Sequence, residues 1–380
     1  MDMSIFSQLR WNFVYQRPQH LIGRMAKEYR TFYFEEPEDI EKYPSNESKQ
    51  TNYHHYISEE GVNVIVPLLK AGDMDKAPLL EKIVKQVYQD FNIEQDIFWY
   101  YTPMAMEYTS FFNPKITIYD CMDQLAAFKN APQNLISLEK ELFKKADLIF
   151  TGGKSLYKAK KEHHDFVYCF PSSIDQNHFK RAAADLPDPE DQKVIPHPRA
   201  GFYGVVDERF DTGLLKEVAS HLPDWNFVIV GPVLKIDPTT LPQAENIHYL
   251  GIKKYAELPR YLANWDAAIM PFALNESTKY ISPTKTPEYL AAGKKVVSTA
   301  VHDVVHPYED LNLVSIARSS AEFADQLRNT LVESPQWEAE VQAYLKDFSW
   351  DDTCKQMNEL IAEKLAEKDN VFEEKIAEVE

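Results

Sequence analysis

The chain lacks the features that mark membrane-spanning, disulfide-bonded and zinc-binding proteins. No run approaches the roughly 18 consecutive apolar residues of a membrane helix, and the N-terminus has no basic segment followed by an apolar one. The three cysteines, Cys121, Cys169 and Cys354, are far apart and odd in number. We therefore expect a soluble, cytoplasmic protein with reduced cysteines and no structural metal.

Two nucleotide-binding signatures are also absent. With 11 glycines among 380 residues, no G-x-G-x-x-G follows an expected strand, which argues against a dinucleotide-dependent dehydrogenase. Gly153-Lys154-Ser155 imitates the end of a phosphate-binding P-loop, but Leu148 stands where such a loop requires glycine. We interpret this segment as the start of a helix.

Positive charge is scarce. The formal net charge of −18 opposes nucleic-acid binding, which depends on Lys and Arg neutralising phosphates. Any anionic ligand must be held by a few local cations. One group of lysines leaves two alternatives open, a peripheral contact with an anionic membrane surface or simply solvated helix faces. These are Lys140, Lys144, Lys145, Lys154, Lys158, Lys160 and Lys161.

The length and the pattern of strands predict two α/β domains. Short β-branched and aromatic runs alternate with helical segments in both halves, which is typical of parallel sheets in Rossmann-like domains. A Pro- and Asp-rich stretch, 181–198, interrupts the pattern and is predicted to be a linker. We therefore expect a first domain over 1–180, a second over 199–347, and a crossing helix with an acidic tail over 348–380.

The segment Pro271–Ser298 gathers polar groups between an expected strand and a helix that Gly293 would end. If Ser282 caps this helix and Pro283 is its first residue, the free N–H groups near Thr284 and Lys285 form an anion site suited to a diphosphate. The helix could instead begin with Thr286 as cap and Pro287 first. Glu288 could accept both hydroxyls of a ribose, or could only stabilise the helix dipole.

These residues carry a resemblance. The motif PTKTPEYLAAGKKVVST resembles the donor site of GT-B glycosyltransferases, particularly the retaining group 1 (family 4) enzymes of polysaccharide and glycan assembly. Early segments (SQLRWNFVYQRPQHLIGRMA, YDCMDQLAAF) and a later one (FYGVVDERFDTGLL) resemble successive parts of the same fold. The resemblance implies two Rossmann-like domains facing across a cleft. It also implies transfer from a nucleotide-sugar, with UDP favoured, to a glycan or lipid-linked acceptor, retaining the anomeric configuration without cofactor or metal.

The resemblance also implies donor-side roles. Arg209 and Lys285 would neutralise the diphosphate, and Glu288 would hold the ribose. Gly204 would allow close approach of the backbone, and the loop ending at Tyr255 would lie near the base.

One departure from the family pattern concerns the transferred sugar. Many relatives carry a second glutamate eight residues before the ribose glutamate, where this chain has Tyr280. Asn275 or Glu276 would be the substitute, and we expect Asn275 in the nucleotide-sugar site.

On the acceptor side, the candidates follow expected strands, where a parallel sheet places ligands. Asp120 and Asp123 could orient sugar hydroxyls during catalysis, or could be an acidic pair at a helix start. Arg10, Trp11 and Arg17 follow the first strand, and for Arg17 a surface or interdomain ion pair is an equal alternative.

Other readings of the sequence stay open. Asp73-Met74-Asp75 could imitate the metal-binding motif of single-domain glycosyltransferases, but we interpret it as a loop because it lies far along the chain from the donor-like segment. A nucleotide-sugar epimerase or mutase, or a nonhydrolytic sugar- or nucleotide-binding protein, would use a similar two-domain cleft.

Overall fold

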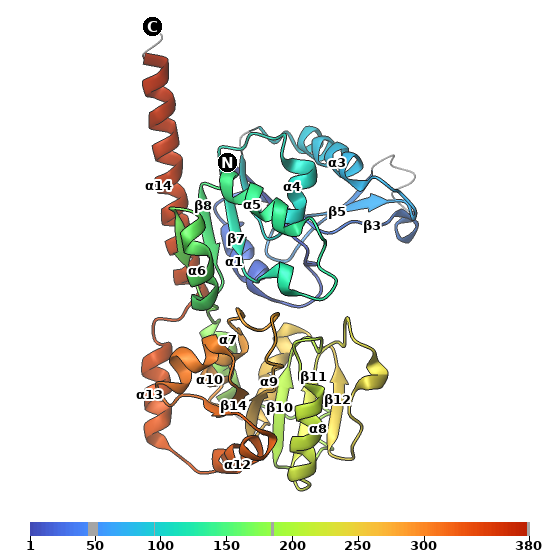
Figure 1. Cartoon of the computed structure of the whole chain (residues 1–380), viewed down its shortest axis with the longest axis vertical. Coiled ribbons are helices and arrows are strands. Elements are labelled where there is room, and N and C mark those ends of the chain that lie inside the picture. The colour runs from blue at the N-terminus through green and yellow to red at the C-terminus, as the bar shows by residue number, and fades with distance from the viewer. Residues whose placement is uncertain (45–51, 95, 184–185, 378–380) are drawn as a thin grey trace.

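A computed structural model describes residues 1–44, 52–94, 96–183 and 186–377. Two α/β domains lie one above the other, and the last helix, α14 (Trp350–Ala377), runs back along the first domain (Figure 1). The predicted fold class is confirmed by this arrangement. In the described part of the chain, no helix is both long and apolar enough to cross a membrane.

The first domain is built on a sheet with the order β3-β5-β2-β1-β6-β7-β8-β9 and with β4 paired to β5. All of its described pairings are parallel except that of β4 with β5. Buried, largely apolar strands of this kind need helices on both faces. The strands are β1 (Asp2–Phe6), β2 (Arg30–Phe34), β3 (Glu38–Asp39), β4 (Tyr53–Ile57), β5 (Asn63–Leu69), β6 (Asp96–Tyr100), β7 (Ile116–Cys121), β8 (Leu148–Thr151) and β9 (Val167–Cys169).

The second domain has a wholly parallel sheet with the order β12-β11-β10-β13-β14-β15. Its order reverses beside β10, at the point where open parallel sheets commonly bind ligands. The strands are β10 (Arg199–Tyr203), β11 (Asn226–Val230), β12 (Ile247–Gly251), β13 (Ala267–Met270), β14 (Val296–Thr299) and β15 (Ser315–Ala317).

Helices cover both faces of each sheet. Those of the first domain are α1 (Arg17–Met25), α3 (Lys76–Phe91), α4 (Met106–Thr109), α5 (Leu135–Lys145) and α6 (Lys154–Lys160). Those that follow are α7 (Gln176–Lys180), α8 (Thr212–His221), α9 (Leu258–Ala263), α10 (Lys285–Ala291), α11 (His302–Val304), α12 (Ser320–Thr330) and α13 (Pro335–Leu345). The expected helix start at Gly153 is confirmed, since Gly153 is the N-cap of α6.

Strand β4 was not expected from the sequence. Its residues, Tyr53-His54-His55-Tyr56-Ile57, include polar side chains that hide the apolar pattern of a strand, and they form a hairpin with β5. The turn of this hairpin, 58–62, reaches the cleft between the domains. The missed strand therefore matters for the site.

The core of the second domain begins earlier in the chain than the predicted linker. Ile174 and Phe179 are buried in that core, together with Ala182 and Ile195 from the expected linker. Asp188 also accepts a hydrogen bond from Arg199 at 2.6 Å. The described part of 181–198 is thus packed onto the second domain. Residues 184–185 of the linker and 378–380 of the tail lie outside the described residues.

The chain crosses between the domains twice, and the two crossings are joined by hydrogen bonds. The side chain of Gln176 donates to the carbonyls of Leu345 (2.6 Å) and Phe348 (2.8 Å), and the amide of Trp350 donates to the carbonyl of Ile174 (3.2 Å). The Trp350 ring is fully buried in the first domain's core. The end of the chain is thus anchored to the domain where the chain begins.

Candidate functional site

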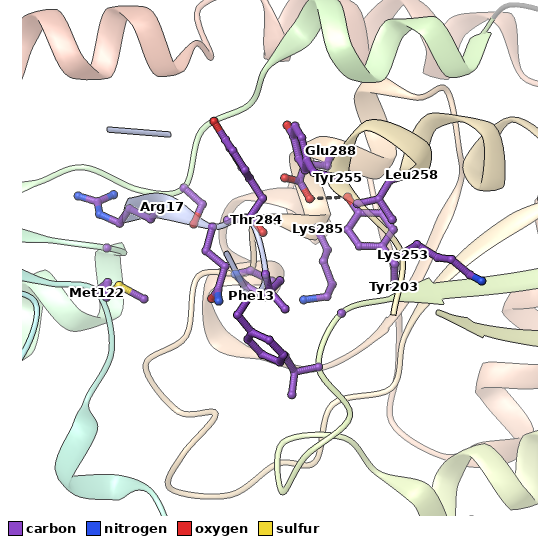
Figure 2. A pocket seen from close by; sticks show the side chains of 18 of the residues that line it. Phe13, Arg17, Met122, Tyr203, Lys253, Tyr255, Leu258, Thr284, Lys285 and Glu288 are labelled. Carbon is purple, nitrogen blue, oxygen red and sulfur yellow. Dashed lines mark hydrogen bonds between the residues drawn. The ribbon is translucent and has the colours of Figure 1, made fainter. Parts of the chain in front are cut away.

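A cavity of about 510 Å³ lies between the two domains. Its walls come from segments that follow strand ends, including 11–17 after β1, 122–123 after β7, 203–205 after β10 and 253–258 after β12. Because the strands of each sheet are parallel, their carboxyl ends meet at one edge, and the two edges face each other across the cavity. Figure 2 shows residues of both walls.

Glu288, on α10, is a buried carboxylate in this cavity. Its Oε2 accepts a hydrogen bond from the hydroxyl of Tyr203, the last residue of β10 (Figure 2). Burial raises the pKa of Glu288 to about 7, while the Tyr203 hydrogen bond and the charge of Lys285 oppose this change. With a pKa near neutral pH, the carboxylate can gain or lose its proton when a ligand binds.

Lys285, one helical turn before Glu288, provides a cation with no ion-pair partner among the described residues. Its ammonium lies 5.4 Å from the ring centre of Phe202 and 5.9 Å from that of Phe272. Burial and the nearby Arg209 lower the pKa of Lys285 to about 8. An unpaired ammonium in a cavity is a natural partner for an anion.

Gly204 is required where it lies. Its φ of +137° falls in a region that favours glycine, and a Cβ there would come within 2.7 Å of the Nζ of Lys285. The glycine gives the lysine room beside the strand end. Its predicted role, close approach of the backbone to the ligand, fits this position.

Arg209 lines the cavity but is already paired. Its Nε and Nη2 donate to the carboxylate of Asp207, the latter at 2.7 Å, which leaves Nη1 without a hydrogen-bond partner among the described residues. Asp123 of the first domain also lines the cavity, and burial raises its pKa while Arg209 and Lys285 oppose the rise. The two predicted cations and Asp123 are therefore brought together.

A loop of the first domain contacts the second domain beside the cavity. The Phe128 ring lies 5.4 Å from the guanidinium carbon of Arg209 and 5.8 Å from the ammonium of Lys235. The amide of Lys129 donates to both carboxylate oxygens of Glu208, at 3.0 and 3.2 Å. We call these five residues the cleft clasp. It holds the domains closed beside the cavity.

The helix α10 begins at Lys285, between the two starts that the sequence allowed. Pro287 is its third residue, where a backbone N–H has no partner within the helix, so the proline costs no hydrogen bond. Both expected caps were therefore wrong. Ser282, Pro283 and Thr284 still line the cavity, and Gly293 ends the helix with a positive φ of 72°.

Tyr255 lines the cavity, but both faces of its ring are covered. The Tyr15 ring stacks on one face at 4.5 Å and the His178 ring on the other at 4.1 Å. Stacking of Tyr255 on a nucleobase would require this sandwich to open. In this closed arrangement, Tyr255 joins the two domains.

Asn275 does not line the cavity, which contradicts its predicted place in the sugar site. Its side-chain oxygen accepts from the amides of Ser277 and Thr278, and its nitrogen donates to the carbonyl of Glu208. These bonds brace the loop. Glu276 is 78% exposed, and Tyr280 packs against the core of the first domain, so neither replaces the second glutamate of the relatives.

On the acceptor side, Asp120 and Arg17 form a buried ion pair. The Nε of Arg17 donates to both oxygens of Asp120, at 3.1 and 3.0 Å, and Nη1 donates to the carbonyl of Phe170. Asp120 is fully buried and does not line the cavity, so its predicted catalytic role is wrong. Arg17 lines the cavity and does form an ion pair, but the pair is buried within the first domain rather than at the surface or between the domains.

Arg10 was also misplaced by the sequence. Its guanidinium pairs with Glu35 and Glu38, at 3.1 and 2.8 Å, away from the cavity. Trp11 does line the cavity, and its ring packs edge-on against Tyr33.

The candidate metal motif lies elsewhere. Asp73 accepts a hydrogen bond from the amide of Lys70 in a loop outside the cavity. Among the described residues, no three His, Cys, Asp or Glu gather as metal ligands would.

Several cavity residues were not singled out from the sequence. Tyr203 could have been found, because it ends a strand immediately before Gly204. The turn residues Ser58, Glu59 and Glu60 could not be found, because they lie at the end of the missed strand β4.

One of the lysines considered for a membrane surface is not available. Lys160 is buried and paired with Glu139 at 2.8 Å, so it cannot contribute to such a surface.

Known proteins resemble the chain in both sequence and fold. Residues 204–333 match the family described as Glycosyl transferases group 1. A Bacillus subtilis protein named putative teichuronic acid biosynthesis glycosyltransferase TuaH is 27% identical over 239 residues, which cover 59% of this chain and 59% of that protein.

Solved structures share the fold at low sequence identity. Anabaena Alr3699/HepE in complex with UDP-glucose has a TM-score of 0.69 at 15% identity, covering 96% of this chain and 100% of that one. Sucrose-phosphate synthase from Thermosynechococcus elongatus has a TM-score of 0.65 at 15% identity, covering 96% and 99%.

We expect that breaking the buried pair from one side destabilises the protein. Arg17→Met leaves the Asp120 carboxylate buried and unpaired, which should lower the free energy of unfolding by about 3–5 kcal/mol in urea denaturation. The double variant Arg17→Met/Asp120→Leu should recover most of this loss. The exposed pair of Arg328 with Asp325 is the control, and Arg328→Met should change stability by less than about 0.5 kcal/mol. An equally small change for Arg17→Met would contradict the pairing.

The cleft clasp predicts an effect on domain closure. Phe128→Ala removes the ring that contacts Arg209 and Lys235, each contact being worth about 0.5–1 kcal/mol. Small-angle scattering should then show a larger radius of gyration. Phe166→Ala is the matched control, because the Phe166 ring contacts Lys364 within the first domain's own unit. Identical scattering from the parent and Phe128→Ala would show that the clasp does not hold the domains.

The second domain therefore resembles the group 1 glycosyltransferases over residues 204–333, and the chain as a whole has the GT-B fold of the solved structures.

Proposed function

We propose that this chain transfers a sugar from a nucleoside-diphosphate sugar to the hydroxyl of a glycan or lipid-linked acceptor. The observation that carries the proposal is the cavity itself, where a buried carboxylate lies one helical turn from an unpaired ammonium and near a guanidinium. Glu288 would accept the ribose hydroxyls, and Lys285 with Arg209 would face the diphosphate. A UDP-sugar is the favoured donor, because HepE was solved with UDP-glucose.

The chemistry follows from where negative charge develops. As the bond between sugar and phosphate breaks, the leaving diphosphate gains charge, and preorganised cations stabilise that state more than the starting one. We propose that the sugar retains its anomeric configuration, with the leaving phosphate helping to take the proton of the acceptor hydroxyl on the same face. No protein nucleophile is needed in this scheme.

The acceptor would lie against the wall formed by 11–17 and 58–60. This wall carries aromatic rings beside amide, hydroxyl and carboxylate groups, including Trp11, Asn12 and Gln16, which suits the faces and hydroxyls of sugars. The relative TuaH is named for teichuronic acid biosynthesis, which supports a polysaccharide acceptor. A peripheral membrane contact stays a prediction.

The test of this proposal is donor binding. Among UDP-, GDP-, dTDP- and ADP-sugars, UDP-sugars should raise the melting temperature most, by mass action. Glu288→Gln should weaken UDP binding about 10- to 100-fold in calorimetry, because charge-assisted hydrogen bonds to the ribose are lost. Glu276→Gln, on the exposed loop before α10, should leave it unchanged. A protein that binds none of these donors would overturn the proposal, as would isotope exchange without acceptor, which would indicate an epimerase or mutase.

The diphosphate is expected to bind without a divalent metal, since Lys285 and Arg209 supply positive charge in the cavity. UDP affinity should therefore change by less than about 2-fold after extensive chelation with EDTA. The variant Asp73→Ala/Asp75→Ala should bind UDP like the parent. Loss of binding on chelation that Mn²⁺ restores, and that the double variant reproduces, would assign the diphosphate to a metal.

A further inference from the structure

The carboxylate of Glu288 is restrained by a single side chain. Tyr203 donates to Oε2, whereas Oε1 has no hydrogen-bond partner among the described residues. The Tyr203 hydroxyl reaches this position because β10 ends directly beside α10, and the dashed line in Figure 2 marks the bond. One oxygen of the Glu288 carboxylate is therefore hydrogen-bonded, and the other is left to accept a hydrogen bond from a ligand.

The ring of Tyr203 is itself fixed by aromatic neighbours. It packs edge-on against Tyr289, with ring centres 4.9 Å apart, and lies parallel to Phe179 at 6.3 Å. The backbone amide of Tyr203 also donates to the hydroxyl of Tyr289 at 3.0 Å. A donor on a fixed ring limits the rotamers in which the glutamate keeps this hydrogen bond.

The Tyr255 hydroxyl is another polar group near this carboxylate. It is buried and makes no hydrogen bond within the described chain. Since Tyr255 is held between Tyr15 and His178, it does not take over the restraint of Glu288. Among the described residues, Tyr203 is therefore the one side chain that donates a hydrogen bond to the carboxylate.

We propose that Tyr203 is a positioning residue of the donor site, whose hydroxyl fixes Oε2 of Glu288 so that Oε1 accepts a ribose hydroxyl of the nucleotide. This inference rests on the proposed function, because it assigns the ribose to Glu288. Tyr203 would not touch the sugar that is transferred. It would act through the glutamate alone.

The proposal has a consequence for the pH dependence of binding. The titratable groups that face Glu288 are Lys285 and Tyr289 on its own helix, Tyr203 on β10 and Tyr255 on the loop after β12. A plot of nucleotide affinity against pH should therefore have two limbs. On the acid limb, affinity rises with pH as Glu288 ionises, and on the alkaline limb, affinity falls as Lys285 loses its proton. Because the Tyr203 hydrogen bond favours the ionised carboxylate, removing it raises the pKa of Glu288 further and moves only the acid limb to higher pH.

The experiment measures UDP affinity by calorimetry between about pH 6 and 9. Tyr203→Phe should bind UDP about 10-fold more weakly near neutral pH, with its acid limb displaced to higher pH. Adding Glu288→Gln to Tyr203→Phe should cause no loss beyond that of Glu288→Gln alone, because the tyrosine acts through the carboxylate.

The matched control is Tyr119→Phe. Tyr119 donates to Glu139 at 2.8 Å in the first domain, so the same kind of bond is removed away from the cavity, and UDP binding should stay unchanged. A second variant carries 3-fluorotyrosine at position 203, which keeps the ring and hydroxyl but makes the hydroxyl a stronger donor. Its acid limb should move to lower pH. This variant keeps the test valid if Tyr203→Phe does not fold.

The outcomes separate this inference from the proposed function. One outcome would overturn the positioning role alone. In it, the parent binds UDP and Glu288→Gln weakens this binding, but both Tyr203 variants keep the affinity and the pH dependence of the parent. Independent, additive losses from Tyr203→Phe and Glu288→Gln would overturn that role as well. A parent that binds no nucleoside diphosphate would instead overturn the assignment of the ribose to Glu288.

Discussion

The geometry of the cleft depends on the two places where the chain passes between domains. Both crossings run side by side, joined by the side chain of Gln176 and by the amide of Trp350. Two adjacent segments that are hydrogen-bonded to each other resist sliding and twisting more than a single segment would. The stacking of Trp350 on His20, at 4.8 Å, joins these crossings to α1, whose first residue lines the cavity. This arrangement of the domains brings groups far apart in sequence to one place.

The architecture and the second domain's wall of the cavity could be predicted because they follow local rules. Alternating apolar strands and helices specify the sheets, and Glu288, Lys285 and Gly204 lie at strand or helix ends in the segment matched by the family. The exact start of α10 could not be predicted, since two prolines allowed two caps. The structure selects a third start, in which Pro287 loses no hydrogen bond.

The first domain's wall of the cavity was harder to predict, because ion pairs between distant parts of the chain decide which charged side chains are free. Arg17 and Asp120 are 103 residues apart, and nothing local indicates that they neutralise each other. Arg10 is likewise paired with Glu35 and Glu38, which follow β2. Asn275 shows a smaller version of the problem, since its amide is used to brace its own loop rather than to bind a ligand. A polar residue after a strand is thus a candidate whose partners determine its role.

The charges that remain at the cleft would allow this acidic protein to hold an anion. With a net charge of −18, the surface as a whole repels nucleotides, so attraction must come from a place where water and neighbouring acids are excluded. Asp207 neutralises part of Arg209, but no described acid pairs with Lys285. Burial moves the pKa values of Lys285 and Glu288 towards each other, to about 8 and about 7, and both charges cost free energy while the site is empty. A ligand that carries a diphosphate next to a ribose would relieve both costs at once, whereas phosphate alone or a nucleoside alone would relieve only one.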